Sequence, residues 1–146
     1  MAGCLAIGAV AAVIALRHDP AQAQPAAPAY RIIVHPATAD SSVERKFLAQ
    51  AFLKKTTLWS DGETIHPVDL PPSSPVRRRF SEEVLERPVA AVRSYWQQLI
   101  FSGRGIPPPE LDNDEAVVRY VVRHAGAVGY VSGSADVHNA KVLGIR

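Results

Sequence analysis

The sequence has 146 residues and a formal net charge of +2, with 16 Lys and Arg against 14 Asp and Glu. So small a charge argues against a nucleic-acid partner, and the length accommodates one domain. An apolar run at residues 4–16 opens the chain, and it has the length of a signal-peptide core but is too short to span a bilayer. Ala21 and Ala23 are the small residues that a cleavage site needs, so we expect a signal peptide at 1–23 and a periplasmic or secreted protein.

Two alternatives to cleavage stay open. The segment before the apolar run lacks the usual Lys or Arg, which leaves an uncleaved N-terminal anchor as one alternative. A lipoprotein is less favoured, because Cys4 precedes the apolar run instead of following it. Cleavage after Ala23 would remove the one cysteine, so the mature chain would form no disulfide. Residues 24–29 predict a short extended tether, and 30–146 the folded domain.

The first elements of that domain are a strand, a helix and a second strand. Residues 30–34 (YRIIV) predict a compact strand. Ser41 followed by Glu44 predicts a capping box, and the helix that it starts should end near Lys54. The apolar stripe of this helix is Val43, Phe47, Leu48, Ala51 and Phe52. A turn around Asp61 then leads to a short strand at 64–70, in which Pro67 favours a sheet edge.

Two helices follow in the middle of the chain. Ser74 is a good N-cap and Pro75 suits the first helical position, where its missing N–H costs nothing. Val76, Phe80 and Val84 share one face of that helix. Pro88 starts the next helix, which Gly103 ends. Its apolar positions at helical spacing are Val89, Val92, Trp96, Leu99 and Ile100.

The last third predicts one more helix and two buried strands. After the loop at 103–110, Asp112 and Glu115 form a second capping box. The apolar face of the helix is Val117, Tyr120, Val121 and His124, and Gly126 stops it. The strands AVGYV (127–131) and KVLGI (141–145) close the chain. The whole pattern predicts an α/β domain with a mixed sheet and helices packed on it.

Residues that could carry catalysis or bind metal are sparse. The four histidines of the mature chain are His35, His66, His124 and His138. They have no metal-binding spacing, and no Gly-x-Ser-x-Gly elbow is present. The acidic residues Asp112, Asp114 and Glu115 are explained by helix capping. We therefore expect neither an enzyme nor a cofactor or metal. Trp59 and Trp96 are candidates for a ligand groove, although Trp96 lies on an apolar helix face, which favours the core.

Three consecutive arginines follow the Ser74 cap, at residues 77–79. A helix turns about 100° per residue, so the three cannot point the same way. Arg77, in the first turn, is placed to reach back toward the cap, whereas Arg78 and Arg79 should be solvated. Cations in the first turn oppose the helix dipole, and a bound anion would relieve that cost. Either a plain capped helix or a weak anion site fits this stretch.

Four segments occur in an order and spacing that resemble those of a known family. They are FLKKTTLWSDGETIHPVD, SSPVRRRF, YWQQLIFSGRGIPP and AGAVGYV, all within residues 30–131. Together they resemble the second half of phosphate-binding proteins of ABC transporters, which are type 2 periplasmic binding proteins. Short secreted single-lobe proteins of this kind are similar over the same span. The resemblance implies an α/β domain that is a single lobe of a fold that closes on phosphate.

The chain departs from that family at the phosphate motif. The family pattern Arg-x-x-x-Ser-Gly-Thr falls on Leu70, Ser74, Pro75 and Val76, so only the serine is retained. Leu70 removes a charge-assisted contact and Pro75 removes a backbone N–H. The other lobe of the relatives is not contained in the chain.

Two functions follow as expectations. The first is a solute-binding module for phosphate or another small anion, serving uptake or sensing, with a weak site at Ser73, Ser74, Val76 and Arg77. The second is an envelope interaction module that kept the fold and lost the ligand. Its partner, another protein or a second copy, would contact the face that carries Ser73, Ser74 and the loop at 103–108.

Overall fold

The computed structural model describes residues 27–146, so the expected signal peptide and the first half of the expected tether lie outside the described residues. The strands are β1 (Tyr30–Val34), β2 (Ser42–Val43), β3 (His66–Pro67), β4 (Ala127–Ser132) and β5 (Lys141–Ile145). The helices are α1 (Arg45–Phe52), α2 (Pro75–Glu83), α3 (Val89–Phe101) and α4 (Asp114–Arg123). Within residues 27–146, no helix is both long enough and apolar enough to cross a bilayer.

The five strands form one mixed sheet in the order β2-β5-β1-β4-β3. β1 pairs antiparallel with both β4 and β5, while β2 runs parallel to β5 and β3 parallel to β4. β3, which contains Pro67, lies at an edge, where a residue without an N–H is tolerated. The predicted α/β class, with a mixed sheet and helices packed on it, is confirmed.

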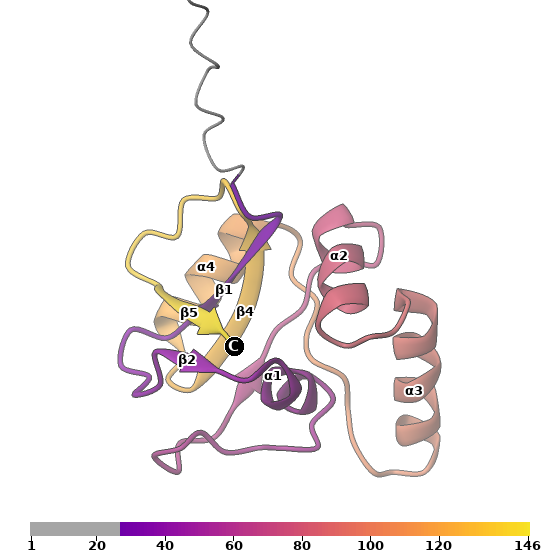
Figure 1. Cartoon of the computed structure of the whole chain (residues 1–146). Coiled ribbons are helices and arrows are strands. Elements are labelled where there is room, and N and C mark those ends of the chain that lie inside the picture. The colour runs from indigo at the N-terminus through magenta and orange to yellow at the C-terminus, as the bar shows by residue number, and fades with distance from the viewer. Residues whose placement is uncertain (1–26) are drawn as a thin grey trace, which may run out of the picture.

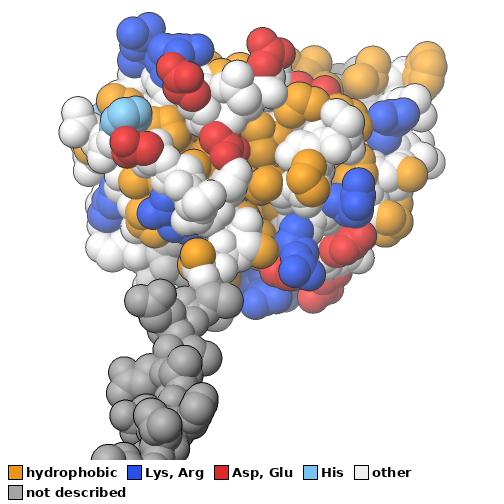
Figure 2. Space-filling view, turned by 90° about the horizontal axis from the view of Figure 1, so that it is seen from above, with side chains coloured by type: hydrophobic (Ala, Val, Ile, Leu, Met, Phe, Trp, Pro, Cys, Tyr) orange, Lys and Arg blue, Asp and Glu red, His pale blue; other side chains and the backbone are white. Residues whose placement is uncertain are grey.

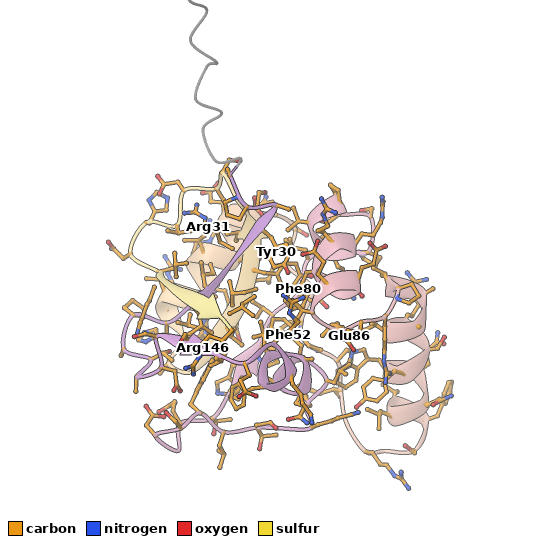
Figure 3. The ribbon with its side chains drawn as sticks, viewed as in Figure 1. Tyr30, Arg31, Phe52, Phe80, Glu86 and Arg146 are labelled. Atoms are coloured by element: carbon orange, nitrogen blue, oxygen red, sulfur yellow. The ribbon has the colours of Figure 1, made fainter. Side chains whose placement is uncertain are left out.

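Helices cover both faces of the sheet (Figure 1). α4 lies behind the sheet in that view and packs on β4, where Gly129 allows a close approach. A Cβ at this position would come within 2.6 Å of Val117 Cγ1, a side chain of α4. The opposite face carries Tyr130, whose ring stacks on Phe80 of α2 at 3.9 Å between centroids. Phe52 of α1 lies 4.7 Å from the same Phe80 ring (Figure 3).

This aromatic cluster joins the helical half of the chain to the sheet. Tyr30 meets Phe80 edge-on at 5.9 Å, and Phe52 also packs on Tyr130 at 5.8 Å. Such pairs add about 0.5–1.5 kcal/mol each beyond the burial of their area. α3 in turn packs against α2 (Figure 1). The cluster therefore determines where α2 begins relative to the ends of β3 and β4.

Both predicted capping boxes are wrong in detail. Residues 42–43 form β2 instead of a helical turn, because their backbone pairs with β5, and Glu44 becomes the N-cap without a side-chain cap bond. The N-cap of α4 is Asn113, one residue after Asp112, and its side chain accepts from the Ala116 N–H at 2.9 Å. In the first case tertiary strand pairing overrides a local motif. In the second, Asn is as good a cap as Asp.

Candidate functional site

The N-terminus of α2 is built as the sequence predicts. The Ser74 hydroxyl accepts a hydrogen bond from the Arg77 N–H at 3.3 Å, and Pro75 occupies the first helical position. Arg78 N–H donates to the Ser74 carbonyl at 3.1 Å. The cap thus uses two of the first-turn donors, and Pro75 supplies none.

The three arginines separate as expected. Arg78 and Arg79 are exposed, and Arg79 pairs with Glu83 one turn later at 3.5 Å. Arg77 is only 7% exposed and turns back toward the loop that precedes α2. A buried guanidinium needs a counter-charge and hydrogen-bond acceptors.

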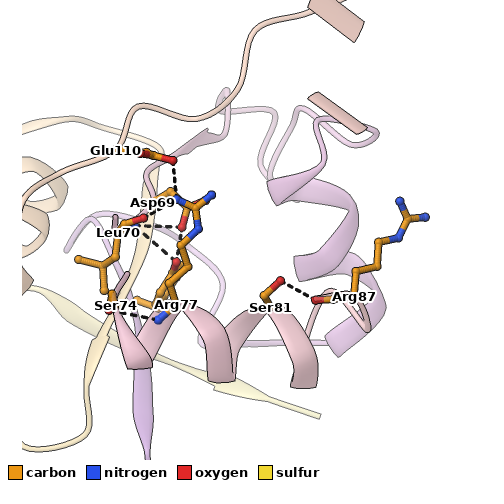
Figure 4. Close-up of polar contacts among 8 residues, drawn as sticks. Asp69, Leu70, Ser74, Arg77, Ser81, Arg87 and Glu110 are labelled. Carbon is orange, nitrogen blue, oxygen red and sulfur yellow. Dashed lines mark hydrogen bonds and ion pairs between the residues drawn. The ribbon is translucent and has the colours of Figure 1, made fainter. Parts of the chain in front are cut away.

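Two carboxylates and one carbonyl hold Arg77 (Figure 4). Its Nη2 lies 3.1 Å from Asp69 Oδ2, and its Nη1 lies 2.5 Å from Glu110 Oε1. Nη1 also donates to the Leu70 carbonyl at 2.5 Å. The guanidinium therefore contacts the backbone of Leu70, the residue that stands where the resemblance places an arginine.

Asp69 is the buried member of this network. The Tyr130 hydroxyl donates to Asp69 Oδ1, and the Leu70 N–H donates to the same oxygen at 3.0 Å. Burial raises the pKa of Asp69, while Arg77 and the two hydrogen bonds oppose that rise. Burial is also the main cause that raises the pKa of the Tyr130 hydroxyl. Tyr130 therefore remains a donor to the carboxylate across the neutral pH range.

Glu110 reaches Arg77 from the loop before α4. Two backbone hydrogen bonds tie this loop to the end of β3, from Asp69 N–H to the Pro109 carbonyl at 2.9 Å and from Leu111 N–H to the Asp69 carbonyl at 2.8 Å. The Glu110 side chain is 48% exposed, in contrast to that of Asp69 at 9%. Asp69 is thus a fixed partner of Arg77, and Glu110 a solvent-accessible one.

A small pocket opens beside this network, between α3 and the loop. Its volume is about 150 Å³. The residues that line it are Asp69, Arg77, Arg93, Trp96, Gln97, Ile100, Pro107, Pro108 and Glu110. Trp96 is a core residue, as expected, and it also lines this pocket.

The four predicted anion-site residues lie together at the start of α2, but most of their donors are engaged. Ser73 is exposed, Ser74 caps the helix, and both the N–H and the guanidinium of Arg77 have internal partners. Among residues 27–146, the Val76 N–H has no acceptor. An anion at this place would find the Val76 N–H and the Ser74 hydroxyl proton as ready donors.

Sequence reasoning missed Asp69, Glu110 and Tyr130. A charged residue inside the apolar segment PVDL was a usable indication, because a carboxylate that follows a buried strand needs a partner. Glu110 follows three prolines in a loop, and nothing local marks it. In the described part of the chain, no group of three or more His, Cys, Asp or Glu side chains is arranged to hold a metal ion.

Comparison with known proteins identifies the fold through solved structures. The sequence matches no protein-family model. It also matches no curated protein. A phosphate transport receptor of the ABC type from Vibrio cholerae is similar with a TM-score of 0.59 and 18% identity, over 80% of this chain and 46% of that chain.

Two further structures show the same likeness. One, from Clostridium perfringens, is described as a phosphate ABC transporter substrate-binding protein with bound phosphate, with a TM-score of 0.62 and 15% identity, over 80% of this chain and 44% of that chain. The other is PstS from Borrelia burgdorferi, with a TM-score of 0.61 and 10% identity, over 81% of this chain and 47% of that chain. The chain thus has the fold of a lobe of these periplasmic binding proteins, and it spans less than half of their length.

The Asp69–Arg77 pair should be a major contributor to stability. We expect Asp69→Ala to lower the free energy of unfolding by about 3 kcal/mol, because Arg77 loses its buried counter-charge and Tyr130 its acceptor. Asp69→Asn should cost about half as much, since the amide oxygen still accepts from Tyr130. Urea denaturation followed by tryptophan fluorescence measures both. The matched control is Glu82→Ala on the exposed face of α2, with an expected change within about 0.5 kcal/mol. An equal effect of Asp69→Ala and Glu82→Ala would contradict this role.

Proposed function

We propose that this protein is an exported solute-binding module of the phosphate-binding type, associated with the uptake or sensing of phosphate or another small anion. The observation that carries the proposal is the fold shared over about four-fifths of the chain with three phosphate-transport binding proteins. The one from Clostridium perfringens holds a bound phosphate. All three are binding proteins, which favours binding over catalysis for this chain.

The start of α2 is the place that we assign to the anion. Helix N-termini attract anions through free N–H groups and the helix dipole. Ser73, Ser74, Val76 and Arg77 surround this point, and the Val76 N–H is the free first-turn donor. A charged hydrogen bond contributes roughly 1.5–3 kcal/mol, and the dipole less than about 1 kcal/mol.

The carboxylates around Arg77 limit the strength of such a site. Asp69 and Glu110 together carry two negative charges against the one positive charge of Arg77. An incoming anion is repelled by that surplus and has to compete with Glu110 for the guanidinium. After the entropic cost of association, we expect an affinity of about millimolar, near −4 kcal/mol.

A second candidate function is an envelope protein–protein interaction module. The observation that favours it is the exposure of three large apolar side chains close together in sequence: Phe101 is 91% exposed, Ile106 70% and Ile100 50%. They lie at the end of α3 and in the loop that follows it. Figure 2 shows the molecule from above, and on that face charges of both signs are interspersed with hydrophobic side chains.

Isothermal titration tests the anion proposal. Inorganic phosphate should bind the protein with a dissociation constant of about 1 mM or weaker. Ser74→Ala should weaken binding and also cost about 1 kcal/mol of stability through the lost cap. The control is Ser94→Ala on the exposed face of α3, which should leave phosphate binding unchanged. Absence of any heat with phosphate, sulfate and carboxylates would overturn the proposal.

Export is tested by intact mass. We propose that cleavage follows Ala23, so protein recovered from the periplasm or medium should begin at Gln24. A mass that retains residues 1–23 would contradict cleavage and favour the anchor alternative.

Light scattering tests the interaction module. If the apolar side chains form a self-contact, the protein should associate at about 0.1 mM, and Phe101→Ser should shift it toward the monomer, because an exposed aromatic anchor contributes most of such a contact. A monomer for the unsubstituted protein, together with no captured envelope partner, would count against this function.

A further inference from the structure

The pocket between α3 and the loop before α4 is lined mostly by residues that do not belong to the start of α2. Arg93, Trp96, Gln97 and Ile100 line it from α3 at i, i+3, i+4 and i+7, so one helix face forms a whole wall. Pro107 and Pro108 form part of the opposite side. A mostly apolar concavity with a few convergent charged groups is the usual form of a small-molecule site.

The chain shows which chemical group the Arg77 end of this pocket accepts. Glu110 Oε1 lies 2.5 Å from Arg77 Nη1, so a carboxylate of the chain already forms an ion pair with the guanidinium there. The Glu110 side chain is half-exposed, and the backbone on either side of it is fixed by the two hydrogen bonds to Asp69. Rotation of this side chain would therefore remove one carboxylate from Arg77 Nη1 without moving the loop, while the contacts of Arg77 with Asp69 and the Leu70 carbonyl remain.

A second cation stands on the same pocket wall. Arg93 is exposed, and among residues 27–146 no carboxylate lies within ion-pair distance of it. The pocket thus holds two arginines and two carboxylates. If a ligand carboxylate replaces Glu110 on Arg77, Arg93 is left for a second negative group.

We infer that this pocket binds a small carboxylic acid, whose carboxylate displaces that of Glu110 from Arg77. The apolar body of the acid lies against Trp96 and the two prolines, and a second carboxylate, where present, pairs with Arg93. The planar guanidinium fork matches a carboxylate well, and the volume of about 150 Å³ suits a small acid. This inference rests on the proposed solute-binding function. It shares Arg77 with the phosphate site at the start of α2, but it names a different cavity, the one lined by α3 and the two prolines, and a different ligand.

The test is isothermal titration with propionate and succinate, with phosphate and sulfate in parallel. Glu110→Gln removes the internal competitor and should tighten both acids at least about fivefold. Arg93→Gln should weaken succinate about tenfold and leave propionate nearly unchanged, since only the diacid reaches Arg93. Glu115→Gln and Arg123→Gln on the outer face of α4 make the same charge changes outside the pocket, so both should leave the acids unaffected.

A second measurement uses only the unsubstituted protein, so it does not depend on whether a variant folds. In the unsubstituted protein, propionate should shift the Arg77 side-chain Nε–H resonance in a ¹H–¹⁵N spectrum. An unshifted resonance with propionate at saturating concentration, or equal acid affinities of Glu110→Gln and the unsubstituted protein, would overturn the inference.

The two proposals fail in different ways. Phosphate binding without any response to the acids overturns the acid pocket and leaves the phosphate site standing. Acid binding that Glu110→Gln strengthens, without phosphate binding, supports the pocket and overturns the phosphate site.

Discussion

The burial of one guanidinium is the constraint on which the rest of the site depends. Arg77 belongs to the first turn of α2 and is almost completely covered, so its charge has to be matched inside the protein. Asp69 supplies the match, and Tyr130 and the Leu70 N–H hold the carboxylate in place. These groups come from the segment after β3, from β4 and from α2, so the ion pair and the hydrogen bond from Tyr130 together link three elements.

The same pair governs what the protein can bind. An arginine with no internal partner at the head of a helix would be a strong anion site, whereas one shared by two carboxylates offers an external anion little gain. The two carboxylates differ, however. Asp69 is enclosed and cannot leave without loss of stability, while the Glu110 side chain reaches solvent. The exchangeable partner therefore sets both the strength and the chemical class of any ligand at Arg77.

The packing around the sheet explains why this geometry is maintained. Tyr130 serves two functions, because its ring stacks on Phe80 while its hydroxyl donates to Asp69. Any shift of α2 along the sheet would disturb the aromatic cluster and the ion pair together. On the other face, the absent side chain of Gly129 lets α4 approach β4 closely. The sheet is held from both sides, and the start of α2 is positioned by rigid elements.

The sequence by itself determined those features that depend on interactions within a few residues. The strand at 30–34, the Ser74–Pro75 start of α2 and the inward turn of Arg77 were all predictable, because cap chemistry and the 100° helical step act within a few residues. The false helix start at Ser41 was equally local, and there the pairing of β2 with β5 prevailed. That Asp69 and Glu110 meet at Arg77 was decided only by the tertiary structure. Asp69 is one loop away from Arg77, but Glu110 is separated from it by α3 and two loops. No short-range pattern encodes a contact that exists only once the fold has brought those loops together.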